Sequence, residues 1–267
     1  MYPLLRSVNW AAKTFNELPI WKGECRVWTQ RMISPNFERW LYLRAHQVGM
    51  MGRDEREFLE KTIRPGMQIL DVGSNIGLYS IIMARLAGPE GRVTSFEPDL
   101  ELFTVFRRNC ELNGIVNLTA HQLALGSARA RLLLNKMIVN SGDNHLGATP
   151  HVLFREAIAA EVVSLDEHLP NLPVDFVKLD EQGWELEALR GMRRMLTANL
   201  NVKIYFEFMP QNCPRAGSSY DDLLDYLQSL DFQIMDPVGG QVLDRAALTV
   251  LAKSLRGLHY TNLLACR

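Results

Sequence analysis

The stretch Asp71–Gly77, with the sequence DVGSNIG, follows the short apolar run Met67–Val72 and opens the helical pattern Gly77–Ala87. A glycine-rich turn between a strand and a helix presents backbone N–H groups at the positive end of the helix dipole, which suits polar ligand groups. The next strand-like run ends at Glu97, 24 residues after Gly73. A carboxylate at that place can accept hydrogen bonds from both hydroxyls of a ribose. Together the two features predict an α/β fold with a site for a nucleoside-containing cofactor.

The residue types of this turn favour S-adenosylmethionine over a dinucleotide. A dinucleotide requires G-x-G-x-x-G, in which a bare second glycine lets the pyrophosphate approach the backbone. Asn75 stands at that position, and the strand before it ends in Asp71. A carboxylate there would repel a pyrophosphate but would attract the amino group and the positive sulfur of S-adenosylmethionine. An NAD-dependent oxidoreductase is the alternative, because Glu97 would hold a ribose in either case.

Strand-like runs alternate with helical patterns from Pro65 onward. This alternation implies right-handed βαβ crossovers, and hence a mostly parallel sheet with helices on both faces. We expect one α/β domain over residues 53–267. Its expected strands are Met67–Val72, Arg92–Phe96, Asn117–Leu125, Val174–Leu179, Val202–Phe208, Phe232–Met235 and His259–Ala265, and its expected helices are Asp54–Ile63, Gly77–Ala87, Asp99–Leu112, Trp184–Leu196 and one that begins at Ser219.

Two segments fall outside the alternation. Residues 131–160 include the polar, turn-rich stretch Asn140–Gly147, and a loop of that length in a compact domain is expected to serve function. Residues 1–52 are expected to form a helical N-terminal extension that packs on the sheet domain. A more specific alternative is that the extension forms a substrate lid or a homodimer surface, because large aromatic side chains anchor pockets and interfaces. Four of the five tryptophans lie in this extension, namely Trp10, Trp21, Trp28 and Trp40.

Composition restricts the class of protein. The 267 residues carry 29 basic and 30 acidic side chains, whereas a non-specific nucleic-acid binder needs a large excess of Lys and Arg. No apolar run approaches the roughly 18–20 residues that span a bilayer, and the N-terminus lacks the uninterrupted apolar core of a signal peptide. We therefore expect a cytoplasmic globular protein whose partner is a small molecule or glycan, without nucleic acid and without a membrane span.

Three side chains are candidates for a base or for orienting the methyl acceptor. An alcohol is a poor nucleophile until a base removes its proton. Asp180 and Glu207 come at the ends of two expected strands, where ligands bind in an open α/β sheet, and Lys178 is the expected partner of Glu207. His145 lies in the polar stretch, and its ordinary pKa suits proton transfer. Asp180 could instead cap the next helix, and His145 could be a solvated turn residue.

Four segments, in this order, resemble the FkbM-type methyltransferases, a branch of the class I S-adenosylmethionine-dependent enzymes: ILDVGSNIGLYSI (69–81), VTSFEPD (93–99), VKLDEQGWELEALRGM (177–192) and IYFEF (204–208). The resemblance implies a Rossmann-like domain with a seven-stranded, mostly parallel sheet whose last strand is antiparallel. It also implies O-methylation of a hydroxyl on a sugar or natural product, with S-adenosylhomocysteine as the product.

The resemblance assigns the cofactor contacts as well. It places Asp71, Gly73, Asn75 and Gly77 around the methionine moiety, Glu97 at the ribose, and Leu123 and Ala124 beside the adenine. Ser74 belongs to the same turn and is included in the expected cofactor site. The acceptor pocket is expected to form between Asn140–Gly147, the N-terminal extension and the end of the fifth strand.

The chain departs from the family at Glu181, where an apolar residue is common. Asp180, Glu181 and Glu207 could together chelate Mg²⁺, which prefers hard oxygen ligands. No clear Asp–Asn pair accompanies them, so we expect no metal. A non-catalytic scaffold on a methyltransferase fold, with the N-terminal extension as its binding surface, is an alternative of another class, because a fold alone does not establish a function.

Overall fold

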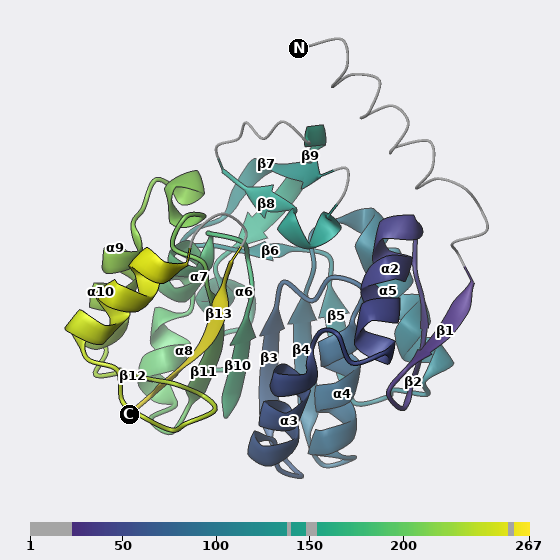
Figure 1. The fold of residues 1–267 in the computed structure, drawn as a ribbon, viewed down its shortest axis with the longest axis horizontal. Coiled ribbons are helices and arrows are strands. Elements are labelled where there is room, and N and C mark those ends of the chain that lie inside the picture. Colours follow the sequence, from purple (N-terminus) through teal and green to yellow (C-terminus); the bar gives the residue numbers. More distant parts are fainter. Residues whose placement is uncertain (1–22, 138–139, 148–153, 256–258) are drawn as a thin grey trace.

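The central element of the fold is a seven-stranded sheet in the order β12-β13-β11-β10-β3-β4-β5 (Figure 1). The computed structural model describes residues 23–137, 140–147, 154–255 and 259–267. Strand β13 is antiparallel to both of its neighbours, and β3, β4, β5, β10 and β11 are parallel. The strands are β3 (Gln68–Val72), β4 (Arg92–Phe96), β5 (Leu118–His121), β10 (Phe176–Leu179), β11 (Lys203–Phe208), β12 (Gln233–Met235) and β13 (Thr261–Cys266). The expected mostly parallel sheet with an antiparallel last strand is confirmed.

Helices cover both faces of this sheet, because successive residues of its strands point to opposite sides and both sides are apolar. Ile69 packs with Leu59 on the face of α3 and α4. The adjacent Leu70 packs with Leu186 on the face of α7–α10. The helices are α3 (Arg53–Thr62), α4 (Leu78–Ala87), α5 (Leu100–Leu112), α6 (Leu165–His168), α7 (Glu185–Gly191), α8 (Arg193–Ala198), α9 (Tyr220–Ser229) and α10 (Arg245–Ser254). Within the described ranges, none of the helices combines the length and hydrophobicity that a bilayer crossing requires.

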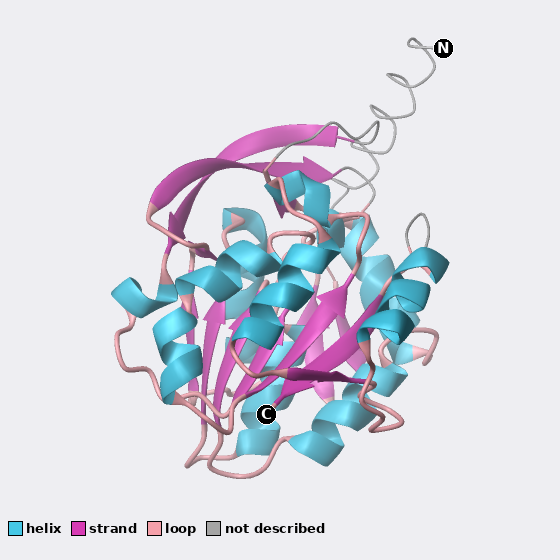
Figure 2. Cartoon of the chain, turned by 90° about the vertical axis from the view of Figure 1, so that its left-hand side faces the viewer, coloured by secondary structure: helices cyan, strands magenta, loops and turns pink. Residues whose placement is uncertain are grey.

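A second, four-stranded sheet was not expected from the sequence. It has the order β6-β9-β7-β8, and its two long strands arch over the top of the central sheet in Figure 2. The strands are β6 (Ala124–Leu125), β7 (Ala130–Met137), β8 (His145–Leu146) and β9 (Phe154–Val163). β6 follows β5 directly, so this sheet lies at the carboxyl ends of the parallel strands. Residues 131–160, which we expected to be largely loop, thus supply most of a small sheet above the site.

The described part of the N-terminal extension is only partly helical. A hairpin of β1 (Glu24–Val27) and β2 (Gln30–Ile33) precedes the helix α2 (Phe37–Gln47), which corrects the expectation of an all-helical extension. The hairpin is stabilised because Val27 and Met32 bury their side chains in one apolar cluster with Ile81 and Ile82 of α4. Trp10 and Trp21 lie outside the described residues. The hairpin and α2 share one apolar cluster with α4, so this segment packs directly on the sheet domain.

Candidate functional site

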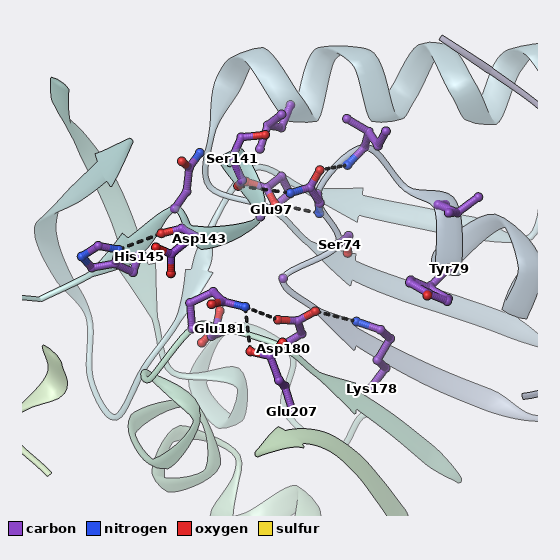
Figure 3. A pocket seen from close by; sticks show the side chains of 18 of the residues that line it. Ser74, Tyr79, Glu97, Ser141, Asp143, His145, Lys178, Asp180, Glu181 and Glu207 are labelled. Carbon is purple, nitrogen blue, oxygen red and sulfur yellow. Dashed lines mark hydrogen bonds and ion pairs between the residues drawn. The ribbon is translucent and has the colours of Figure 1, made fainter. Parts of the chain in front are cut away.

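A cavity of about 230 Å³ lies at the carboxyl ends of β3, β4, β10 and β11 (Figure 3). Its other walls include α2, the segment between α2 and α3, the start of α4, residues 140–146 and the start of β13. The cavity brings together residues that are far apart in the chain, and most of the predicted site residues line it. These are Asp71, Gly73, Ser74, Asn75, Glu97, Ala124, His145, Asp180 and Glu207.

The turn between β3 and α4 (residues 71–77), the first turn of the sheet domain, is held in a shape that leaves no room for a side chain at Gly73. Gly73 has φ +80°, and a Cβ there would lie 1.8 Å from the backbone oxygen of Asp180. The N–H groups of Gly73 and Ser74 both donate to the carbonyl of Phe96, at 3.1 and 3.0 Å. Asn75 also has a left-handed backbone, with φ 53°, a conformation that Asn tolerates better than most residues. The turn therefore joins the ends of β3, β4 and β10 in one fixed arrangement.

The carboxyl group of Glu97 is held by two backbone N–H groups, one for each of its oxygens. It is buried, its Oε2 accepts from the N–H of Asn75 at 2.8 Å, and its Oε1 accepts from the N–H of Asp99 at 2.8 Å. Burial raises the pKa of Glu97 to about 8, although the two N–H donors act in the opposite direction. A carboxylate oxygen has about two acceptor sites, so each oxygen can still accept one hydroxyl, as a ribose diol requires.

Asp71 is fully buried at the end of β3. Its Oδ2 accepts a hydrogen bond from the hydroxyl of Ser80, and its buried Oδ1 has no hydrogen-bond partner among the described residues. Lys178 stands opposite Asp71 in the register of β10 with β3. Burial raises the pKa of Asp71, and the nearby Lys178 charge lowers it. A buried acceptor without a partner is costly, so this place is suited to a donor or cation from a ligand.

The two carboxylates at the ends of β10 and β11 form one hydrogen-bonded group. The amide nitrogen of Gln182 donates to Asp180 Oδ1 at 3.0 Å and to Glu207 Oε2 at 2.7 Å. The Nζ of Lys178 lies 3.3 Å from Asp180 Oδ2, so Lys178 pairs with Asp180 and the expected pairing with Glu207 was wrong. Figure 3 places Lys178, Asp180 and Glu207 side by side. The sequence pattern found the carboxylates but missed Gln182 as their bridge.

Burial and neighbouring charges shift the pKa values of Glu207 and Lys178. The pKa of Glu207 is raised well above its usual range by burial and by the negative charges of Asp180 and Glu185. The pKa of Lys178 is raised because Asp180 and Asp71 outweigh the effect of burial, which alone would lower it. Lys178 therefore stays protonated, and Glu207 keeps its proton to a higher pH than an exposed glutamate does. Lys178, Asp180 and Glu207 thus bring hydrogen-bond donors and acceptors close together at the end of β10 and β11.

His145 lies on the opposite wall of the cavity from these carboxylates (Figure 3). It is buried in β8, and its Nδ1 is 2.8 Å from the backbone oxygen of Asp143. Asp143 in turn forms an ion pair with Arg215, with 2.6 Å between Oδ1 and the guanidinium nitrogen. The interpretation of His145 as a solvated turn residue is wrong, because β8 and its neighbours enclose the ring.

Glu181 and Glu185 complete the corner after β10. Both oxygens of Glu185 accept from the N–H of Gly183, at 3.2 and 2.9 Å, so this residue shapes the loop. Glu181 has a buried Oε2 without a hydrogen-bond partner among the described residues, and burial raises its pKa well above the usual range. No cluster of three His, Cys, Asp or Glu side chains in the described ranges has the arrangement of a metal site. Asp180, Glu181 and Glu207 thus do not converge as Mg²⁺ ligands would.

Two predicted cofactor residues, Gly77 and Leu123, do not line the cavity. A Cβ at Gly77 would lie 2.0 Å from Cδ2 of Phe106, so the glycine there lets α4 pack against α5. Leu123 packs against the core on the α7–α10 face. The prediction overlooked Phe106 because it comes 29 residues after Gly77 and only the tertiary structure brings the two together.

Four tyrosines also line the cavity and were missed from the sequence. Burial raises the pKa of Tyr42 to about 12, so its hydroxyl stays protonated. Tyr205 precedes Glu207 by two residues on β11, and the two-residue period of a strand could have placed them on the same face. No such local signal marks the others. The four are Tyr42, Tyr79, Tyr205 and Tyr260.

The sequence matches the family model described as the methyltransferase FkbM domain over residues 71–234. "Methyltransferase 1" of Beauveria bassiana is 30% identical over 144 residues, which cover 46% of this chain and 57% of that protein. "Methyltransferase sdnD" of Sordaria araneosa is 28% identical over 155 residues, covering 46% and 60%. The chain thus matches somewhat more than half the length of these relatives. Among solved structures, a precorrin-6y C5,15-methyltransferase of Geobacter metallireducens has 11% identity and a TM-score of 0.46, covering 80% of this chain and 86% of that one.

Proposed function

Since the chain belongs to the FkbM methyltransferase family, we propose that it transfers the methyl group of S-adenosylmethionine to a hydroxyl of a small natural product or a sugar. The observation that carries the proposal is Glu97, buried beside the first turn with each carboxylate oxygen fixed by one backbone N–H. This is an acceptor pair of the kind that a ribose diol requires. The unpartnered Oδ1 of Asp71 supports it, because a buried acceptor of this kind fits the amino group of the methionine moiety.

Bound S-adenosylmethionine would supply a methyl group on a positively charged sulfur. Glu97 would hold the ribose, Asp71 and the turn from Gly73 to Asn75 would hold the methionine moiety, and Ala124 would lie beside the adenine. These residues fit the group, because acidic side chains outnumber Lys and Arg in the cavity lining and the cofactor carries two positive charges. A pyrophosphate would meet the same carboxylates as like charges.

We assign the base to Asp180. Its carboxylate is fixed by Lys178 and Gln182, and its side chain keeps 34% of its surface exposed at the cavity. It would accept the proton of the acceptor hydroxyl. Glu207, whose pKa is raised by burial and by Asp180, would in its protonated form donate a hydrogen bond that orients the acceptor. His145 would orient the acceptor from the opposite wall.

Replacement of Glu97 by glutamine tests the cofactor site. We expect Glu97→Gln to weaken S-adenosylhomocysteine binding by about 1–3 kcal/mol, the range for a hydrogen bond to a charged group. The amide would present an N–H₂ donor to one of the two backbone N–H groups, and the ribose would lose an acceptor. Titration calorimetry of the wild type and the variant measures the difference.

Glu101→Gln is the matched control, because Glu101 pairs with Lys136 and Arg155 outside the cavity. Its affinity for S-adenosylhomocysteine should equal that of the wild type. Unchanged affinity in Glu97→Gln would contradict the assignment of the ribose site. A thermal shift with NAD that exceeds the shift with S-adenosylmethionine would favour the oxidoreductase alternative.

Cofactor affinity should also depend on pH through Glu97. Because burial raises the pKa of Glu97 to about 8, the free protein carries this carboxyl protonated below that pH, whereas the ribose hydroxyls bind the carboxylate. Binding must then release a proton, and affinity should rise by up to about tenfold per pH unit towards pH 8 and level off above it. Without ligand the sign is opposite: stability should fall between about pH 5 and 8, because the unfolded carboxyl loses its proton first.

Calorimetry in two buffers of different ionisation enthalpy counts the released proton directly. We expect about one proton at pH 7 for the wild type and none for Glu97→Gln, whose amide does not titrate. Affinity that is flat over this range, with no proton released, would mean that Glu97 is already ionised in the free protein.

A further inference from the structure

Helix α2 of the N-terminal extension brings a buried guanidinium to the first turn of the sheet domain. Arg39 is 3% exposed and lines the cavity. One of its terminal nitrogens lies 3.4 Å from Oδ1 of Asn75 in that turn, and the other donates to Oδ1 of Asn140 at 2.9 Å. Arg39 thus spans the space between the turn and the segment above it.

The position of Arg39 on its helix is fixed. The side chain of Asn36 caps α2 by accepting from the N–H of Arg39 at 2.8 Å. The guanidinium carbon lies 4.5 Å from the ring centre of Tyr42, one turn further along the helix. A guanidinium held over an aromatic face and by hydrogen bonds loses little further freedom when it binds an anion.

The extension is tied to the same turn by Asn109 of α5. Its Oδ1 accepts from the N–H of Ile33 in β2 at 2.8 Å, and its Nδ2 donates to the carbonyl of Ile76 in the turn at 2.8 Å. Val27, Met32 and Ile76 share one buried cluster. The hairpin, α5 and the cofactor turn therefore form one unit, and Arg39 keeps its place relative to the turn.

The charges of the cavity restrict what Arg39 can bind. Lys178 is the other Lys or Arg side chain among the described lining residues, and it pairs with Asp180 at the end of β10. S-adenosylmethionine carries a carboxylate on its methionine moiety, and acidic side chains outnumber Lys and Arg in the cavity lining, so few places in the cavity offer that carboxylate a cation. The acidic side chains are Glu55, Asp71, Glu97, Asp143, Asp180, Glu181 and Glu207. A place beside Asn75 and Arg39 offers that carboxylate a cation with planar N–H donors.

Resting on the proposed function, we propose that Arg39 binds the carboxylate of the methionine moiety of S-adenosylmethionine. The N-terminal extension then completes the cofactor site, in addition to covering the sheet domain. The extension and the sheet domain would recognise opposite ends of the amino-acid part: Asp71 the amino group, and Arg39 the carboxylate.

The test compares two ligands that differ by one carboxylate, S-adenosylhomocysteine and S-adenosyl-3-thiopropylamine. In the wild type, calorimetry should give about 10- to 100-fold tighter binding of S-adenosylhomocysteine, the range for a hydrogen-bonded charge pair. Arg39→Met should remove most of that preference, while affinity for the amine changes less than about threefold. Arg39→Lys, which keeps the charge but loses the planar donors, should fall between the two.

Arg44→Met is the matched control, since Arg44 is exposed on the same helix and bonds to Gln47; it should leave both affinities unchanged. Equal losses for the two ligands in Arg39→Met would overturn the inference and make Arg39 a support of the turn. A wild type that binds both ligands equally would overturn it without any variant, even if Arg39→Met did not fold. A wild type that binds neither ligand would overturn the proposed function and this inference with it.

Discussion

Asp180→Asn is expected to slow methyl transfer about 10²–10⁴-fold, the usual contribution of a positioned general base. The amide keeps the shape of the side chain and its hydrogen bond with Gln182, but it cannot take the proton of the acceptor hydroxyl. Affinity for S-adenosylhomocysteine should stay within about threefold of the wild type, because Glu97 and the first turn do not depend on this charge. Transfer of labelled methyl to a panel of hydroxylated acceptors, at saturating S-adenosylmethionine, measures the rate.

Asp175→Asn provides the control on the same segment. Asp175 is exposed just before β10, at the opposite end from the cavity, and accepts from the N–H of Gln68 at 2.8 Å. Its substitution should leave the rate unchanged. Equal losses of rate and cofactor affinity in Asp180→Asn would make Asp180 structural. A larger loss of rate in Glu207→Gln than in Asp180→Asn would transfer the base to Glu207.

The central sheet could be predicted because its strands carry their own signal. β3 and β10 are buried on both faces, so each appears in the sequence as a short, predominantly apolar run bounded by turn residues. The polar residues that interrupt these runs mark the site: Asp71 and Lys178 lie side by side in the register. The carboxyl ends of parallel strands meet at one edge, and this alone placed Asp71, Glu97 and Asp180 near one another.

The parts that were missed depend on contacts between distant segments. Strands β7 and β9 pair over eight residues, but part of each strand is exposed, so neither gives an uninterrupted apolar run. Val27 and Met32 form a hairpin because α4 covers them, and their local sequence does not indicate this. Arg39 has no motif of its own, since its place in the cavity follows from the packing of α2 on the first turn.

Gly73→Ala is the substitution with the largest expected effect on folding, at about 2–5 kcal/mol of unfolding free energy. A Cβ at Gly73 would lie 1.8 Å from the backbone oxygen of Asp180, and φ is +80°. The left-handed backbone costs a residue with a Cβ about 1–2 kcal/mol, and forcing extra atoms into a packed site typically costs about 1–3 kcal/mol more. The loop of Asp180 must move to make room, so S-adenosylhomocysteine affinity should fall as well. Chemical denaturation and calorimetry measure the two effects.

Gly66→Ala separates backbone strain from the steric conflict. Gly66 has φ +88°, but its Cβ would meet nothing within 4 Å, and it lies before β3, away from the cavity. This variant should lose only about 1–2 kcal/mol and keep the cofactor affinity of the wild type. If both variants lost the same stability and both kept their affinity, the close approach of the Asp180 carbonyl would not govern the turn. Loss of affinity in Gly73→Ala alone would tie cofactor binding to the contact between the first turn and the loop that carries the proposed base.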